Sequence, residues 1–319
     1  MKRFKPVDLH CARTHSLKRR KSLVARDKLG SVCRRPLLLK DFVQSLPDIL
    51  AARDFKEIVQ SLSAAHKNNK VILWGIGAHV IKVGLSLILI DLMDRGFVTA
   101  LALNGAGVIH DVEMAMLGQT SEDVATELDS GDFGMAEEPA IFINAAVSRG
   151  VASGKGLGES VGEALLDSGF PYIQESLLAT ATARGIPVTV HVAIGTDIIH
   201  MHPSCSGSDH GEASHRDFRL LTGIVGHLEG GAYLNIGSAV VLPEVFLKAV
   251  NLARNLGHTV NHFTTVTLDF LRHYRPLTNV ASRPVAKGGK GFVLTGHHEI
   301  MIPLLAAALK EVGPDGTKD

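Results

Sequence analysis

Short apolar runs alternate along the chain with longer amphipathic stretches. Residues 71–74 form a run too short for a helix and are followed by glycines, which predicts a buried strand that enters a turn. Bulky apolar residues then recur every three or four positions over 79–93, which predicts a helix that stops at Gly96. Residues 98–103 are apolar without alternation, as in a parallel strand covered on both faces. This order predicts a strand, a crossover helix and a second, parallel strand.

The same pattern continues to the end of the chain. It predicts strands over 187–193, 232–236, 261–266 and 291–294, and helices within 38–65 and over 139–149, 157–168, 172–184, 216–228, 243–255 and 298–309. Strands that alternate with helices are typical of an α/β fold, with a Rossmann-like parallel sheet flanked by helices. We expect a basic N-terminal arm over residues 1–37 and a single α/β nucleotide-binding domain over residues 38–319.

Composition excludes several classes of protein. A net charge of +1 argues against a dedicated nucleic-acid binder, and the longest apolar run, residues 83–90, is far shorter than the roughly 20 residues of a membrane span. The three cysteines show no CxxC spacing, and the N-terminus has no apolar signal-peptide core. We therefore expect a cytoplasmic protein with no membrane partner.

The N-terminal arm carries twelve Lys or Arg residues between Lys2 and Arg35. A solvated tail is one interpretation, and contact with an anionic partner or a neighbouring subunit is the other.

Two glycine turns follow the first two predicted strands. The carboxyl ends of parallel strands share one edge of the sheet, where ligands bind and backbone N–H groups suit a phosphate. The alternative is that these glycines only permit tight turns. The candidate residues are Gly75, Gly77, Ala78 and His79 in the first turn and Asn104, Gly105, Ala106 and Gly107 in the second.

Two polar segments carry further chemistry. Residues 120–138 hold seven Asp or Glu residues, which indicates either a solvated loop or a lid over a cationic substrate. A second stretch combines His200, His202, His210 and His215 with Cys205, Asp209 and Glu212. Its irregular spacing leaves three interpretations open. The histidines either face solvent or form hydrogen bonds within the protein, or they bind substrate, or they form a metal site for a hydrolase.

Amine transfer through an imine requires a lysine with a lowered pKa and a nearby acid or base. Lys287 precedes a strand expected to end at the glycine edge, although it and Lys290 also fit a solvated loop. His110 is a candidate acid or base, and Asp111 either orients it or simply begins a helix.

The chain resembles the deoxyhypusine synthase family, NAD-dependent aminobutyl transferases, over roughly residues 71–310. The segments that carry the resemblance are GIGAHVIKVGL, NGAGVIHDVEMA, LNIGSAVVLPEVFLKAVNLAR and FVLTGHHEIMIPLL. The resemblance implies a tetramer with sites at dimer interfaces, and NAD lying across the glycine turns. By position it adds Gly237, Ser238, Gly296, His297 and Glu299 to the NAD contacts, with Asp197 near the family's acidic position. Glu299 fits a helix-terminus carboxylate equally well.

The family's motifs are only partly present. Pro284 stands at the family's imine-forming lysine, which leaves Lys287 or Lys290 as the nearest replacement, and Pro243 and Glu244 stand near its histidine base. We therefore expect an NAD-dependent oxidation or aminoalkyl transfer on a small, cationic amine, not necessarily deoxyhypusine formation, by a dimer or tetramer. The alternatives are a non-catalytic nucleotide-binding protein of this fold and a metal-assisted hydrolase that uses the segment from His200 to His215.

Overall fold

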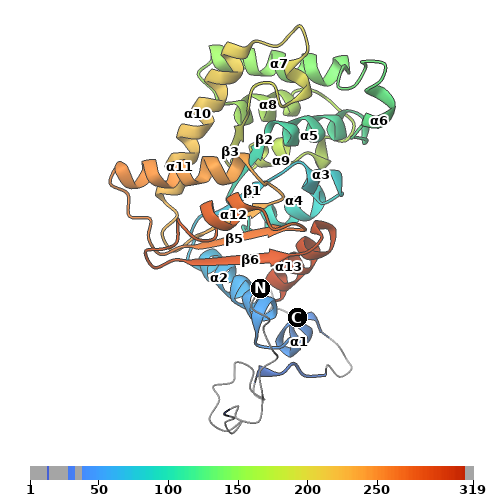
Figure 1. Ribbon diagram of the computed structural model, residues 1–319. Coiled ribbons are helices and arrows are strands. Elements are labelled where there is room, and N and C mark those ends of the chain that lie inside the picture. Colours follow the sequence, from blue (N-terminus) through green and yellow to red (C-terminus); the bar gives the residue numbers. More distant parts are fainter. Residues whose placement is uncertain (1–12, 14–27, 33–37, 313–319) are drawn as a thin grey trace, which may run out of the picture.

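A computed structural model describes residue 13, residues 28–32 and residues 38–312. Most of the basic arm lies outside these residues. Six parallel strands form one sheet in the order β3-β2-β1-β4-β5-β6 (Figure 1). The strands are β1 (Ile72–Ile76), β2 (Ala100–Asn104), β3 (Val188–His191), β4 (Ala232–Ile236), β5 (Thr264–Asp269) and β6 (Lys290–Thr295). The strand order reverses between β1 and β4, as in dinucleotide-binding Rossmann sheets, so the predicted fold class is confirmed.

Helices cover both faces of the sheet. Alternate side chains of β1 enter two separate apolar clusters: Ile72, Trp74 and Ile76 enter the larger one, and Leu73 enters the smaller one. The larger cluster draws on α2 (Leu50–Lys67), α4 (Ser86–Asp94), α5 (Gly105–Leu117), α7 (Glu137–Ala152), α8 (Leu157–Leu166), α9 (Leu177–Ala183) and α13 (His298–Val312). The smaller cluster draws on α10 (Gly207–Gly226), α11 (Val241–Asn255) and the segment around α12 (Tyr274–Asn279). Burial on both faces explains why β1 and β2 are apolar without alternation, whereas in β3 and β5 buried threonines alternate with apolar residues.

Short elements complete the chain. They are α1 (Leu39–Ser45), α3 (His79–Lys82), α6 (Val124–Glu127) and the 3-10 turns η3 (Ile173–Glu175) and η4 (Ile198–His200). Figure 1 shows α2 and α13 beside β6 at one end of the sheet, whereas α7, α8 and α10 lie at the other end. None of the helices in the described part of the chain is long and apolar enough to cross a membrane.

Several predicted elements differ from the structure. The helix expected over 79–93 is divided into α3 and α4, because Gly84 adopts a left-handed backbone with φ +76°. The first strand does not end at Trp74: it runs through Gly75, whose missing side chain makes room for the ring of Tyr233 on the adjacent strand. Helix α10 begins nine residues before the predicted position 216, and α12 was not predicted.

Candidate functional site

The turns after β1 and β4 touch at the point where the strand order reverses. The Gly77 amide donates to Ile236 O at 2.8 Å, and a Cβ on Gly77 would overlap the backbone carbonyl of Gly237. Gly237 has φ +65°, and its amide donates to Leu268 O at 3.1 Å. Both glycines are therefore required by close backbone approach and, at Gly237, by the left-handed conformation.

Ala78 and His79 follow this contact and begin α3. His79 Nδ1 lies 2.9 Å from Nδ1 of His298, which is fully buried at the start of α13. His298 Nε2 lies 3.3 Å from Leu268 O, and Phe270 packs against both rings. Burial lowers the pKa of His298. The structure thus joins the ends of β1 and β5 to the start of α13 through two histidines and one phenylalanine.

The other residues that the resemblance placed here have local roles. Gly296 gives room to the side chain of Met301, and Ser238 Oγ accepts the Leu242 amide at 3.3 Å and so caps α11. His297 stacks on Phe270, with ring centroids 6.2 Å apart, and faces Glu299 at 3.7 Å. The side chains of His297 and Glu299 are 67% and 47% exposed, so both remain accessible to a ligand.

The second glycine turn is not an open loop. Asn104 caps α5 by accepting the Gly107 amide at 3.0 Å, and the carboxylate of Asp197 accepts the Ala106 amide. Gly105 has no side chain, and a Cβ there would overlap the Asp197 carboxylate. The amino end of α5 is therefore occupied by the protein's own carboxylate and amide groups. The Ala106 and Gly107 amides are therefore already used, and the predicted contact of Asn104–Gly107 with a nucleotide stays a prediction.

Asp197 is buried between the start of α5 and a small cavity. Burial raises its pKa to about 6, although the Ala106 amide opposes this shift. Its Oδ2 atom is buried, lies against Gly105 and lacks a hydrogen-bond donor among the described residues. Asp197 also lines a cavity of about 170 Å³ together with Lys82, His110 and Glu113.

His110 is oriented by residues other than the predicted Asp111. His110 Nδ1 lies 2.6 Å from Thr120 Oγ1, which donates to Glu113 Oε2. Burial of Glu113 favours its neutral form, but hydrogen bonds from His110 and Thr120 hold the pKa of Glu113 below its usual range. The Thr120 hydroxyl therefore donates its hydrogen to the anionic Glu113, and the Thr120 oxygen accepts from His110 Nδ1–H. His110 Nε2 is then left with a lone pair that can accept a proton.

Asp111 points into the protein, away from His110. It is fully buried and accepts hydrogen bonds from Ser176 Oγ at 2.6 Å and from the amides of Leu177 and Leu178 at 2.8 and 3.1 Å. It therefore caps the start of α9 from a distant part of the chain. Burial raises the pKa of Asp111 to about 6. The expectation that Asp111 orients His110 is wrong.

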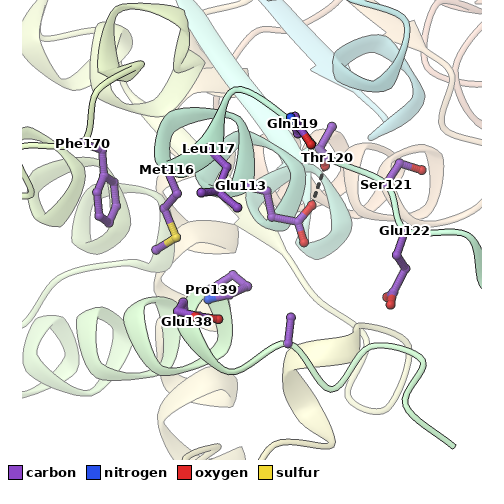
Figure 2. A pocket seen from close by; sticks show the side chains of 11 residues that line it. Glu113, Met116, Leu117, Gln119, Thr120, Ser121, Glu122, Glu138, Pro139 and Phe170 are labelled. Carbon is purple, nitrogen blue, oxygen red and sulfur yellow. Dashed lines mark hydrogen bonds between the residues drawn. The ribbon is translucent and has the colours of Figure 1, made fainter. Parts of the chain in front are cut away.

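A larger cavity of about 540 Å³ adjoins the first and shares Glu113, Ser121 and Glu122 with it. Figure 2 shows Glu113 and Thr120 on the side of α5 and Glu138 across the cavity at the start of α7. The apolar part of the wall is formed by Met116, Leu117, Ala136, Pro139 and Phe170. Among the described residues, three carboxylates and no cationic side chain line this cavity. The acidic segment predicted as either a lid or a solvated loop thus forms part of the wall.

Lys287 lies at the wrong edge of the sheet for the predicted role. It is exposed in the turn before β6, and β6 starts at the edge opposite the glycine turns. Six residues at about 3.3 Å each separate the two edges by about 20 Å. Lys290 is directed to Glu57 of α2 at 3.6 Å. The lysine that lines the candidate site is Lys82.

The histidine-rich segment does not gather into a metal site. No group of three or more His, Cys, Asp or Glu side chains among the described residues is arranged to hold a metal ion. His200 Nδ1 accepts the Gly195 amide at 3.2 Å, His202 Nδ1 lies 2.8 Å from Ser204 Oγ, and His210 Nε2 lies 2.8 Å from Asn144 Oδ1. His215 is exposed on α10.

Four residues of the site were absent from the predicted set, namely Lys82, Glu113, Thr120 and Phe270, whereas His298 lies within the range 296–299 that the resemblance placed at the nucleotide. Lys82 and Glu113 each stand three residues from a predicted site residue, His79 and His110, so helical spacing offered a signal. The contact of His298 with His79 spans 219 residues and had no signal in the pattern.

Comparison with known proteins gives remote structural likeness alone. No family model and no curated protein sequence matches the chain. A complex of AgrE with ornithine and NAD⁺ superposes with a TM-score of 0.54 at 15% identity over 84% of this chain. The chain spans only 33% to 34% of AgrE and of ArgZ, an arginine dihydrolase of a cyanobacterial ornithine-ammonia cycle.

Two further structures are matched over more of their own length. A candidate LOR/SDH protein from Methanococcus maripaludis S2 superposes with a TM-score of 0.50 at 14% identity, over 90% of this chain and 73% of that one. A candidate deoxyhypusine synthase from Entamoeba histolytica superposes with a TM-score of 0.51 at 11% identity, over 88% and 95%. The chain thus has a Rossmann-like α/β fold of the kind found in deoxyhypusine synthase-like and AgrE-like proteins.

Proposed function

We propose that this protein binds NAD at the carboxyl edge of its sheet and acts on a small cationic amine held in the adjoining cavities. The single observation that carries the proposal is the 540 Å³ cavity, which places three carboxylates over an apolar wall and adjoins the smaller cavity at Ala106 and Asp197. An alkyl amine has a matching chemistry, because its ammonium pairs with carboxylates while its carbon chain contacts apolar side chains.

The turns at Gly77 and Gly237 lie where the strand order reverses, which is where Rossmann sheets hold a dinucleotide. Their backbones pack against each other and their amides donate to Ile236 O and Leu268 O, so a nucleotide would be held by the side chains around them. Exposed Phe270 offers an aromatic face beside the turns. Bound NAD would supply a hydride acceptor.

The residues of the chain supply binding and proton transfer. Glu113, Glu122 and Glu138 would orient the ammonium group, and His110 Nε2 would take up a proton released from the substrate. Lys82 is the lysine positioned to replace the family's imine-forming residue if the reaction is a group transfer. The reaction would therefore be an amine oxidation or an aminoalkyl transfer.

The test has two stages. Calorimetric and thermal-shift titrations with NAD⁺, NADH, ADP-ribose and AMP measure binding, since a ligand of the native state raises its apparent stability. L-ornithine, L-arginine, 1,4-diaminobutane and spermidine are then screened with NAD⁺ by the absorbance of reduced nicotinamide.

The carboxylates are tested by Glu113→Gln combined with Glu138→Gln. We expect this variant to lower the rate of nicotinamide reduction with amines about tenfold or more, because one charge pair contributes about 1 to 3 kcal/mol. The affinity for NAD⁺ should stay within about twofold. Glu159→Gln, on the exposed surface of α8, is the matched control. Absence of binding by all four nucleotides would exclude the NAD proposal.

The non-catalytic alternative has one observation in its favour, the placement of Lys287 far from the candidate site. It requires saturable nucleotide binding with no nicotinamide reduction by any of the amines. A positive amine screen excludes it.

A further inference from the structure

A further cavity, of about 320 Å³, lies between α7 and α8 and shares no residue with the two cavities of the candidate site. Its lining residues belong to these two helices, to the turn over residues 153–156 that joins them, and to Asp167 and Ser168 directly after α8. The short turn makes the helices antiparallel neighbours. They are closest at Gly150, where a Cβ would overlap Ser160 Oγ. We call this space the α7–α8 cavity.

Side chains of both charges line the α7–α8 cavity. Arg149 and Lys155 are its cations, and Glu163 and Asp167 are its anions. Lys155 pairs with Glu163. Within the described part of the chain, no ion pair or side-chain hydrogen bond joins the Arg149 guanidinium or the Asp167 carboxylate to another group. The cavity thus holds one cation and one anion that the protein does not neutralise.

These two charges face each other along the helix pair. Arg149 stands one residue from the Gly150–Ser160 contact and Asp167 stands seven, in the same direction because the helices are antiparallel. The difference of six residues places their Cα atoms about 9 Å apart along the axis. Helical side chains lean toward the amino end of their helix, so the two lean toward each other. A ligand with a carboxylate and an ammonium group can therefore join them.

The same cavity also offers an apolar surface. Phe142, Ala146 and Ala164 contribute to its lining. The buried Ser160 hydroxyl is already used, since it donates to Gly156 O at 2.5 Å. This surface suits an aliphatic side chain.

A pair of aromatic rings separates the α7–α8 cavity from the larger cavity of the candidate site. Phe142 lines the former and packs on Phe170, with ring centroids 5.0 Å apart. Figure 2 shows Phe170 beside Met116 in the wall of the larger cavity. The two cavities therefore lie on opposite sides of one wall, and a ligand of one does not enter the other.

We propose that the α7–α8 cavity is a second small-molecule site, which binds an α-amino acid with an apolar side chain. Near neutral pH such a molecule carries both charges. Arg149 pairs with its carboxylate, Asp167 pairs with its ammonium group, and its side chain lies on Phe142 and the two alanines. The larger cavity differs, because three carboxylates and no cation line it among the described residues. The second site does not depend on the proposed function.

The first experiment is calorimetric titration of the full chain with three matched probes, L-leucine, 4-methylpentanoate and 3-methylbutylamine. The second probe is leucine without its ammonium group, and the third is leucine without its carboxylate. We expect each missing group to weaken the affinity about tenfold or more, because a charge-assisted hydrogen bond is lost. Glycine should also bind more weakly than leucine, because it has no apolar side chain.

Substitutions then assign each group of the ligand to its partner. Arg149→Gln should weaken leucine about tenfold or more and bring its affinity close to that of 3-methylbutylamine. Asp167→Asn should do the same relative to 4-methylpentanoate. Both side chains are exposed, so we expect both variants to fold, and thermal unfolding verifies this. The control is Arg53→Gln, an exposed arginine on α2, which should change no affinity.

The outcomes separate this inference from the proposed function. No saturable binding of leucine, or equal affinity for the three probes, would overturn the second site. Leucine binding that survives Arg149→Gln and Asp167→Asn, but is lost when Glu113→Gln is combined with Glu138→Gln, would place the ligand in the larger cavity and also overturn it. Leucine binding lost in the α7–α8 variants would support the second site, even if no nucleotide binds and the proposed function fails.

Discussion

The turns after β1 and β2 have similar sequences, GIGAH and NGAG, yet their glycines contact different groups. At β1, Gly77 lets two backbone segments touch, and the chain continues into His79, which keeps one ring nitrogen free. At β2, Gly105 makes room for the Asp197 carboxylate, which takes an amide of α5. A glycine turn at the carboxyl edge of the sheet thus indicates close approach, and at both turns the approaching group belongs to the protein itself.

The largest expected effect comes from Gly77→Ala. Its Cβ would overlap the Gly237 carbonyl, and a backbone neighbour cannot move aside as a side chain can. We expect the free energy of unfolding to fall by at least about 3 kcal/mol, or folded protein to be lost. Urea denaturation measures this change.

The matched control is Gly211→Ala, in α10, where no atom lies near the added Cβ. It should leave stability unchanged or raise it by up to about 1 kcal/mol. Equal stability of the two variants would contradict the backbone contact at Gly77.

Gly105→Ala should have a smaller effect, because the group it meets is the side chain of Asp197. We expect a loss of about 1 to 3 kcal/mol in the free energy of unfolding. In an Asp197→Ala background the same substitution should cost less than about 0.5 kcal/mol, and a double-mutant cycle measures this coupling. Additive effects would show that the two residues do not meet.

Asp197→Asn tests the burial of the carboxylate. Its pKa is raised from the ordinary 3.8 to about 6, so the folded state holds a proton that the unfolded state has lost. The contribution of Asp197 to stability is therefore present below about pH 4 and is lost as the pH rises through about 6.

The free energy of unfolding of the unsubstituted protein minus that of Asp197→Asn should accordingly fall from about pH 4.5 to pH 7, by at most about 1.4 kcal/mol per pH unit. Urea denaturation of both proteins across this range measures it. A rise of this quantity with pH would contradict the direction of the shift.

The smallest effect is expected for Lys287→Ala, at the edge of the sheet opposite both turns. Stability should change by less than about 0.5 kcal/mol and affinity for NAD⁺ should not change. Lys82→Ala, in the small cavity, should lower the rate of nicotinamide reduction with amines. Loss of that activity in Lys287→Ala alone would restore Lys287 as the predicted imine-forming lysine.

The sequence by itself determined the strands, most helices and the fold class, because these follow from local periodicity. The strand at 232–236 matches β4 to the residue, because burial on both faces of a parallel sheet leaves a short, mainly apolar run that ends in a glycine turn. One or two helices were expected within 38–65, and α1 and α2 occur there. The glycine turns were predicted for the same local reason.

Only the tertiary structure decided which polar residues meet at that edge. Asp111 and Asp197 are both acidic residues that follow a predicted turn. In the structure, Asp111 caps α9, whereas Asp197 accepts an amide at the start of α5. Lys287 precedes a strand in either interpretation, but the edge it reaches depends on the direction of β6 relative to β1. The pairing of His79 with His298 joins positions 219 residues apart, and no local pattern encodes such a contact because packing of the whole sheet creates it.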